Sequence, residues 1–274
     1  MPATAAPLLG APSGPAWKST AKRWGLAWQA FMVHNLVLAD FRVRYRNMSL
    51  GILWSLLNPL VMMAVLALVF TEIFPSARPH FAAFILIGLL PYNFLSLCLA
   101  SASTSIVDRG HLVRKLRFPR AILPVAIILS QGIHFAIQFA LLLVYVGLQV
   151  PPSLNWLWLV PLLALQVLVA IGACMIASAL DVYFRDVRYL VESGNLVLFW
   201  LTPIFYSLDM APRWLQSFLL INPLTAQVTL WRQILLERAA PPAGLALVTI
   251  EALLVFGAGL LIFKRLEPGF ADNI

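Results

Sequence analysis

Long apolar stretches without a charged side chain dominate this sequence and restrict what it can fold into. Residues 47–71, 80–107, 121–150 and 153–180 contain no Asp, Glu, Lys or Arg. A helix needs about 20 apolar residues to cross the hydrocarbon core of a bilayer. Each stretch is therefore long enough to span a membrane as a helix, which satisfies its own backbone hydrogen bonds there.

Two further spans are predicted nearer the end of the chain. Residues 193–208 are uncharged but short, and adding 189–192 at the interface gives them enough length to cross. Residues 245–263 form the last span, which contains the unexplained acidic residue Glu251. Residues 211–238, between these spans, are apolar but interrupted by prolines. We expect them to form a re-entrant pair of short helices.

The expected fold class is an all-α integral membrane protein with six transmembrane helices, an N-terminal interfacial amphipathic helix and a re-entrant helical pair between helices 5 and 6. The composition agrees, since 61% of residues are hydrophobic and 11% are charged, against about 25% charged in soluble domains. The expected segments are a flexible tail at 1–16, the cytoplasmic interfacial helix at 17–40, spans at about 50–72, 81–107, 121–149, 154–180, 189–208 and 245–263, the re-entrant pair at 211–238 and a cytoplasmic tail at 266–274.

The interfacial helix is predicted from its tryptophans. Trp17, Trp24, Trp28 and Phe31 are seven, four and three residues apart, so they share one helix face. Cationic flanks beside such a face are typical of a helix that lies in the membrane plane. The alternative is that these residues anchor the first span.

The distribution of Lys and Arg predicts the orientation. With six spans, fifteen of the nineteen basic residues fall on one side, and only Arg78, Arg213, Arg232 and Arg238 fall on the other. The positive-inside rule then places both termini in the cytoplasm. Because the net charge of +8 is concentrated in these loops, it does not indicate binding of nucleic acid.

Two cytoplasmic loops are candidates for contact with a partner. The loop 108–120 is the densest basic cluster and interleaves its charges with apolar residues, which is typical of a helix that docks into a groove. The loop 181–188 mixes both signs, and local ion pairing is its alternative. The candidate residues are Arg109, His111, Leu112, Arg114, Lys115, Leu116, Arg117, Phe118, Arg120, Arg185 and Asp186.

Other residues are candidates for contact with a transported substrate. Arg42, Arg44 and Arg46 precede the first span, where guanidinium groups could bind a lipid diphosphate or act as ordinary membrane anchors. Gln131, His134 and Gln138 share one face of the third span, where they could line a channel or bond neighbouring helices. Aromatic residues gather toward the outer ends as interfacial belts or as a lining for sugars, among them Tyr92, Trp200, Tyr206, Trp214 and Trp231.

Motifs of catalysis are absent from the sequence. It contains no Gly-Lys-Ser or Gly-Lys-Thr loop for nucleotide phosphates. His134 has no second ligand at a suitable spacing, so no metal site is predicted. If transport consumes ATP, another chain must hydrolyse it.

The chain resembles the membrane permeases of the ABC-2 polysaccharide exporter family, which export O-antigen, capsule and teichoic acid. The resemblance covers nearly the whole chain from about Trp24. It is carried by the order and spacing of Arg44, Tyr45 and Arg46, Ser49, Leu50 and Gly51, Trp54, Asn58 and Pro59, Gly88 and Pro91, Phe118, Pro119 and Arg120, Phe184, Arg185, Asp186 and Val187, Thr202 and Pro203, and Asn222 and Pro223.

This resemblance implies a permease homodimer in the bacterial cytoplasmic (inner) membrane, bound to two copies of an ABC ATP-binding subunit. It implies an undecaprenyl-diphosphate-linked glycan as substrate, with ATP and Mg on the partner and no cofactor in this chain. By the same resemblance, 109–120 would hold the coupling helix, 17–31 the interface helix and 211–238 the gate helices. Three alternatives remain open: an ABC-2 exporter of small hydrophobic drugs or lipids, a polyprenyl-phosphate-dependent membrane enzyme, and a scaffold.

Overall fold

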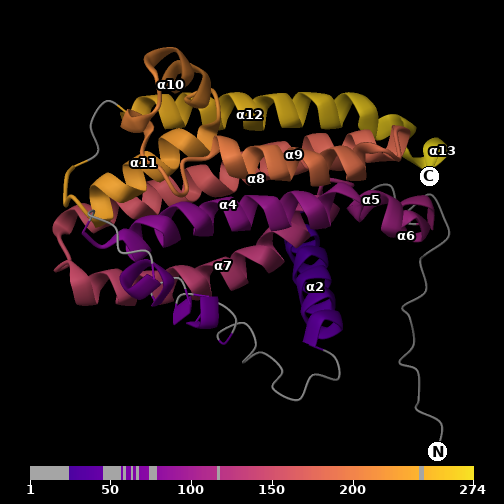
Figure 1. Ribbon diagram of the computed structural model, residues 1–274. Helices are drawn as coiled ribbons and strands as arrows, with labels where there is room; N and C mark the ends of the chain where they lie inside the picture. Colours follow the sequence, from indigo (N-terminus) through magenta and orange to yellow (C-terminus); the bar gives the residue numbers. More distant parts are fainter. Residues whose placement is uncertain are drawn as a thin grey trace, which may run out of the picture.

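The computed structural model describes residues 25–45, 57, 60–62, 64–65, 68–73, 79–115, 118–240 and 244–274. All regular structure in this part of the chain is helical, which confirms the all-α expectation (Figure 1). The elements are α2 (Gly25–Tyr45), η2 (Val69–Ile73), α4 (Phe81–Ser103), α5 (Ser105–Asp108), α6 (Gly110–Lys115), α7 (Ile122–Gln149), η3 (Leu154–Trp158), α8 (Leu159–Tyr183), α9 (Val187–Leu201), η4 (Leu208–Met210), α10 (Arg213–Leu219), α11 (Pro223–Leu235), α12 (Gly244–Leu266), η5 (Glu267–Gly269) and α13 (Phe270–Asn273).

Four helical stretches of the described chain are long and apolar enough to cross a bilayer: Phe81–Ser103, Ile122–Gln149, Leu154–Tyr183 and Gly244–Asn273. The first expected span, at about 50–72, lies largely outside the described residues. In the region of the expected fifth span, α9 has 15 residues, fewer than a straight helix needs to cross.

The long helices α4, α7, α8 and α12 lie along a common direction, and successive ones reverse it from α4 to α7 to α8 (Figure 1). At the centre lies α4, in which every residue from 82 to 92 is buried. Pro91 lies inside this continuous helix and removes one helical hydrogen bond, because proline lacks an N–H. The buried amide of Gln166 on α8 donates to the Pro91 carbonyl at 3.1 Å, which ties α8 to α4 at that point.

Two glycines allow α8 and α12 to touch backbone to backbone. A Cβ added at Gly172 would come within 2.7 Å of the Cα of Phe256, and one at Gly259 within 2.6 Å of the Cα of Gly172. Small residues permit such close approach between helices in membranes. Ala170 is fully buried on the same helix, but the closest contact is made by glycine.

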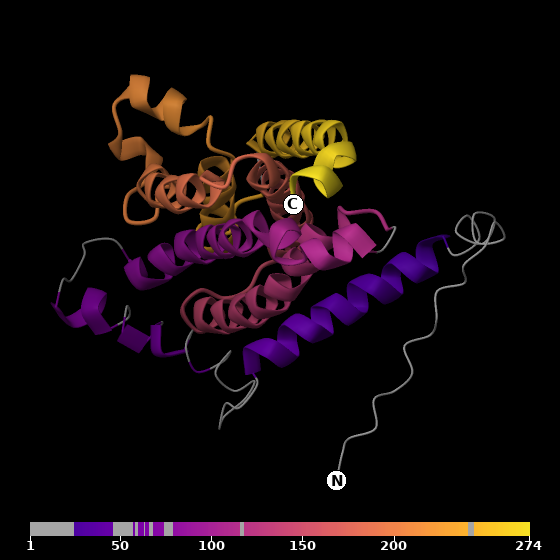
Figure 2. The ribbon, with the colours of Figure 1, turned by 90° about the vertical axis from the view of Figure 1, so that its right-hand side faces the viewer.

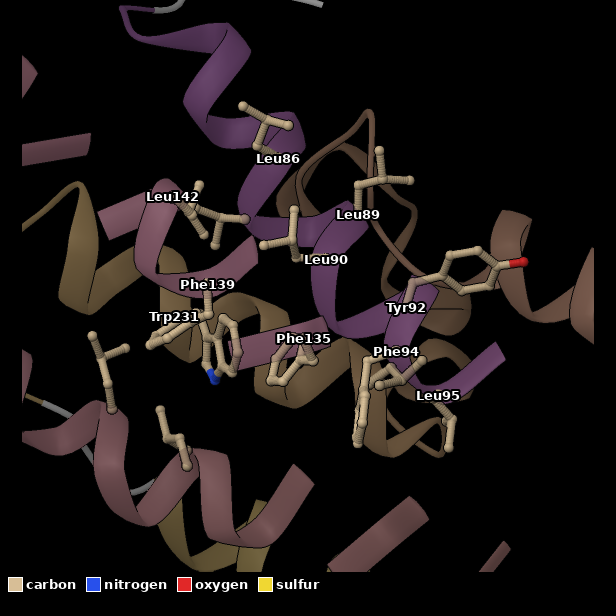
Figure 3. Packing of buried hydrophobic residues seen from close by; sticks show 14 of the residues in the cluster. Leu86, Leu89, Leu90, Tyr92, Phe94, Leu95, Phe135, Phe139, Leu142 and Trp231 are labelled. Carbon is tan, nitrogen blue, oxygen red and sulfur yellow. The ribbon is translucent and has the colours of Figure 1, made fainter. Parts of the chain in front are cut away.

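The segment 211–238, expected to be re-entrant, contains two short helices with very different surroundings. Trp231 of α11 is 0% exposed. Its ring packs 5.2 Å from that of Phe139 on α7, with Phe135 beside them (Figure 3). In contrast, α10 stands away from the bundle in Figure 1, and Trp214 and Phe218 on it are exposed. The interfacial-belt interpretation is therefore wrong for Trp231, because α11 inserts this side chain among the long helices.

Unlike the long helices, α2 runs across the bundle. It crosses their direction in Figure 1 and is seen at full length in Figure 2, which looks toward the end of the bundle. The ring of Phe41 stacks on that of His134 of α7 at 5.1 Å, and Ser130 of α7 donates a hydrogen bond to Asp40. The helix continues to Tyr45, five residues beyond the end expected for the interfacial helix, so it includes Arg42 and Arg44.

Candidate functional site: the basic end of the bundle

Three chain reversals meet at one end of the bundle, on the right in Figure 1. They are the segment from α5 through α6 to the start of α7, the turn between α8 and α9, and the end of α12 with α13. This basic end carries Arg109, Arg114, Lys115, Arg120, Arg185, Arg188, Lys264 and Arg265. At the opposite end the described basic residues are Arg213, Arg232 and Arg238.

The helix α6 presents its charges outward. His111, Arg114 and Lys115 are exposed, whereas Gly110 and Val113 are buried. Residues three and four apart share a helix face, so His111, Arg114 and Lys115 lie together on the outer side. This short helix therefore offers a cationic surface to anything that approaches the end of the bundle.

The apolar residues of the same loop face inward. Phe118 is 8% exposed and belongs to a buried cluster with Val113, Val182 and Phe263, and Leu112 is partly buried against this cluster. Phe118, one of the candidate residues for contact with a partner, therefore has its side chain in the chain's own core. Leu116 and Arg117 lie outside the described residues.

Arginines at the edges of the loop are half-buried. Arg120 lies where the loop enters α7, and its guanidinium donates to the carbonyl oxygen of Glu267 at 3.3 Å. Arg109 lies between α5 and α6. Before it, Thr104 donates to the carboxylate of Asp108 at 2.6 Å across the single turn of α5. These bonds fix the two ends of the loop and leave its middle to present charge.

The turn between α8 and α9 adds a second exposed charged patch. Arg185 and Asp186 are exposed, and Nε of Arg188 donates to the carbonyl oxygen of Arg185 at 3.1 Å. The turn lies at the same end of the bundle as α6 (Figure 1). The structure thus brings the two loops predicted to contact a partner to one end.

Of the predicted diphosphate ligands, Arg42 is exposed on α2 and Arg44 lies in the same helix. Arg46 lies outside the described residues. Arg42 is thus exposed on a helix that crosses the bundle (Figure 2).

The polar residues of α7 have different surroundings. Gln131 is 4% exposed, and its amide donates to the hydroxyl of Ser101 on α4 at 3.1 Å. Of the two interpretations, interhelical bonding is thus the one that the structure gives for Gln131. His134 stacks on Phe41 of α2, and Gln138 is half-buried.

The predicted aromatic lining residues are also divided. Tyr92 is buried, and its hydroxyl donates to the carbonyl oxygen of Asn195 at 3.0 Å, which joins α4 to α9. Tyr206 is half-buried and donates to the carbonyl oxygen of Trp200 at 3.1 Å. Trp200 itself is 65% exposed. Of Tyr92, Trp200 and Tyr206, Trp200 is therefore the side chain with most room for a ligand.

One important residue was missed by the sequence analysis. Arg232 of α11 is buried, and its guanidinium donates to the carbonyl oxygens of Phe84, Ile204 and Tyr206 at 2.8–3.2 Å. Its Cζ also lies 3.4 Å from the centre of the Phe84 ring, a cation–π contact. The signal available was that Arg232 is the single charged residue in the apolar stretch 214–236. Among the described residues no cluster of His, Cys, Asp and Glu could hold a metal ion.

Comparison with known proteins identifies a matching family and several similar proteins. The family model for the ABC-2 type transporter matches residues 33–236. Two proteins named O-antigen export system permease protein RfbA are similar to the chain: that of Klebsiella pneumoniae is 30% identical, over 85% of this chain and 91% of its own length, and that of Myxococcus xanthus is 31% identical, over 88% and 94%. The polysialic acid transport protein KpsM of Escherichia coli is 24% identical, over 92% and 99%.

Proposed function

The chain belongs to the ABC-2 type transporter family, and from this premise we propose that it exports a lipid-linked polysaccharide. It is the membrane permease of an ATP-driven exporter that moves an undecaprenyl-diphosphate-linked glycan, such as O-antigen, across the bacterial inner membrane. The observation that carries the proposal is similarity over at least 85% of the chain to two O-antigen export permeases. ATP and Mg belong to a separate ATP-binding subunit.

The proposed topology has six spans with both termini in the cytoplasm. The clustering of basic residues at one end of the bundle supports that orientation, because Lys and Arg accumulate in cytoplasmic loops. Trp231 of α11 is buried, so protein surrounds this short helix. This supports a re-entrant pair, because the non-helical turn of such a pair is tolerated at membrane depth only where protein surrounds it. In this arrangement α2 lies along the cytoplasmic interface.

The ATP-binding subunit is proposed to dock on α6 and on the turn between α8 and α9. The exposed side chains of Arg114 and Lys115 favour an acidic groove on that partner, and those of Arg185 and Asp186 add a second contact. Complementary charge steers association and fixes register more than it adds affinity. Two copies of the partner and two of this chain make up the proposed complex.

The substrate path is proposed to follow the exposed face of α9, where two copies of the chain would meet. Leu196, Val197 and Trp200 are exposed on this helix. An indole ring offers a flat apolar face on which a sugar can stack, and Trp200 and Tyr206 would provide such faces. Arg42 would engage the lipid diphosphate at the cytoplasmic surface, because guanidinium matches the geometry of phosphate oxygens.

Purification of the tagged chain from its own host tests the proposal. Recovery of an ATP-binding subunit in near-equal amount is expected, and the double variant Arg114→Glu with Lys115→Glu is expected to abolish it. Asp209→Asn, an exposed change at the opposite end of the bundle, is the control. Recovery of the chain without any ATP-binding subunit would contradict the proposal and favour a membrane enzyme. If the ATP-binding subunit is recovered but disrupting the complex leaves export of the lipid-linked glycan intact, an exporter of drugs or lipids would be favoured.

A further inference from the structure

The last described residues fold back onto the basic end of the bundle. After α12, the segment 267–274 forms η5 and α13 beside α6 (Figures 1 and 2). Phe270 is 0% exposed, and its ring lies 5.3 Å from that of Phe263. It belongs to the same buried group as Val113 and Phe118 of the basic loop. The segment expected to be a cytoplasmic tail therefore contributes the side chain of Phe270 to the core.

Hydrogen bonds join Glu267 of this segment and Leu266, the last residue of α12, to the two reversals that carry the exposed charges. The backbone N–H of Arg120 donates to the carboxylate of Glu267 at 3.1 Å, and the guanidinium of Arg120 donates to the carbonyl oxygen of the same residue at 3.3 Å. On the other side, the hydroxyl of Tyr183 donates to the carbonyl oxygen of Leu266 at 2.8 Å. Glu267 thus holds the end of the basic loop, and Tyr183 holds the end of α8 beside the second charged turn.

The short helix α6 is in contact with this segment. α6 has six residues, far fewer than the roughly 12–15 that a helix needs for marginal stability alone. It lies beside the one-turn helix α5 and α13, and its Val113 shares a buried cluster with Phe270 and with residues of α7, α8 and α12. The side chain of Ile274 lies against Gly110, so closely that a Cβ at 110 would have to displace it.

We propose that the segment 267–274 is a brace that positions the cationic face of α6 for docking of the ATP-binding subunit. The proposal rests on the proposed function for the identity of that partner. Phe270 and Glu267 act as positioning residues: they touch neither nucleotide nor glycan, and they hold the loop that carries Arg114 and Lys115. A movement of the partner would be passed to α7, α8 and α12 together, because the brace joins the ends of all three.

Hydrogen exchange of the purified full-length chain tests the brace itself. Phe270→Ala should accelerate exchange of the α6 amides by about tenfold or more and leave exchange of the α4 amides unchanged. Without the Phe270 ring, α6 loses packing that opposes its local opening. Phe270→Leu should restore most of the protection. Asp272→Ala, an exposed change on the same short helix, should alter nothing. Unchanged exchange of α6 in Phe270→Ala would overturn the proposal.

Docking provides the second measurement. Phe270→Ala and Glu267→Ala should lower permease-stimulated ATP hydrolysis and recovery of the ATP-binding subunit several-fold, with the amount of chain in the membrane unchanged. If Phe270→Ala accelerated exchange of the α6 amides but the ATP-binding subunit were still recovered in full, the proposal would also be overturned. Failure of the proposed function looks different: the unaltered chain then recovers no ATP-binding subunit, while the exchange result stands on its own.

Discussion

At Arg232 a guanidinium group is buried among apolar helices at the end of the bundle opposite the basic loop. Burial of a charge is unfavourable unless hydrogen bonds replace its hydration. Three backbone carbonyls and the face of Phe84 do so here. The guanidinium thereby joins α11 to the start of α4 and to the loop after α9, so one side chain determines how the short helix α11 lies against the bundle.

Arg232→Lys should lower the free energy of unfolding by about 2–4 kcal/mol, because a single ammonium group cannot reach all three carbonyl oxygens. Thermal unfolding of the detergent-purified chain measures this change. Arg213→Lys, at an exposed position of the same region, should be neutral. Equal unfolding temperatures for the two variants would show that the bonds of Arg232 contribute little to stability.

Burial of single residues was the least predictable feature of the sequence. Arg232 and Trp231 look like interfacial residues because a sequence shows only that they follow an apolar stretch. Their burial depends on the carbonyls of residues 204 and 206 and on the rings of α7, which only the fold brings near them. In contrast, the sequence alone identified the exposed residues Arg114, Lys115, Arg185 and Asp186 as candidates, because closely spaced charges between apolar stretches indicate a loop.

At the scale of elements, the contact between α8 and α12 is set by glycine. Gly172→Val should destabilise the chain by about 2 kcal/mol or more, because the new side chain must push the backbone of α12 away. The yield of monodisperse protein and its unfolding temperature measure this effect. Gly257→Val is the matched control, since a Cβ at Gly257 meets no atom within 4 Å. Equal loss in both variants would indicate that helix propensity, and not the contact, is responsible.

The position of α2 gives a second prediction at this scale. Phe41→Ala should release the end of α2 from α7 by removing the stacking contact with His134. Hydrogen exchange of α2 should then accelerate more than that of α7, because α7 keeps its contacts with α4. Phe31→Ala changes an exposed side chain of the same helix and should have no such effect. If both variants behave alike, the contact with His134 does not hold α2 in place.

For the molecule as a whole, membrane topology follows from the charge asymmetry between its ends. Reporter fusions after Lys115 and after Arg188 should be active in the cytoplasm, and one after Arg213 should be active on the opposite side. A cytoplasmic signal from the fusion after Arg213 would contradict the proposed six-span arrangement.

The all-helical class and four long apolar helices could be predicted from the sequence, because a bilayer demands uninterrupted apolar runs of helical length. The inward course of residues 267–274 could not. That segment is short and mixed in polarity, and only its neighbours at the basic end give Phe270 a place in the core. Similarly, Gly172 and Gly259 are unremarkable until α8 and α12 are placed side by side.

Transport in reconstituted vesicles tests the central claim most directly. The chain and its co-purified ATP-binding subunit would be placed in inside-out proteoliposomes with undecaprenyl-diphosphate-linked glycan in the outer leaflet. The account predicts that ATP makes the glycan inaccessible to an added glycosidase only when both subunits are present, and that the double variant Arg114→Glu with Lys115→Glu prevents this. Glycan that stays fully accessible, while a hydrophobic dye or a lipid without sugar is moved, would contradict it.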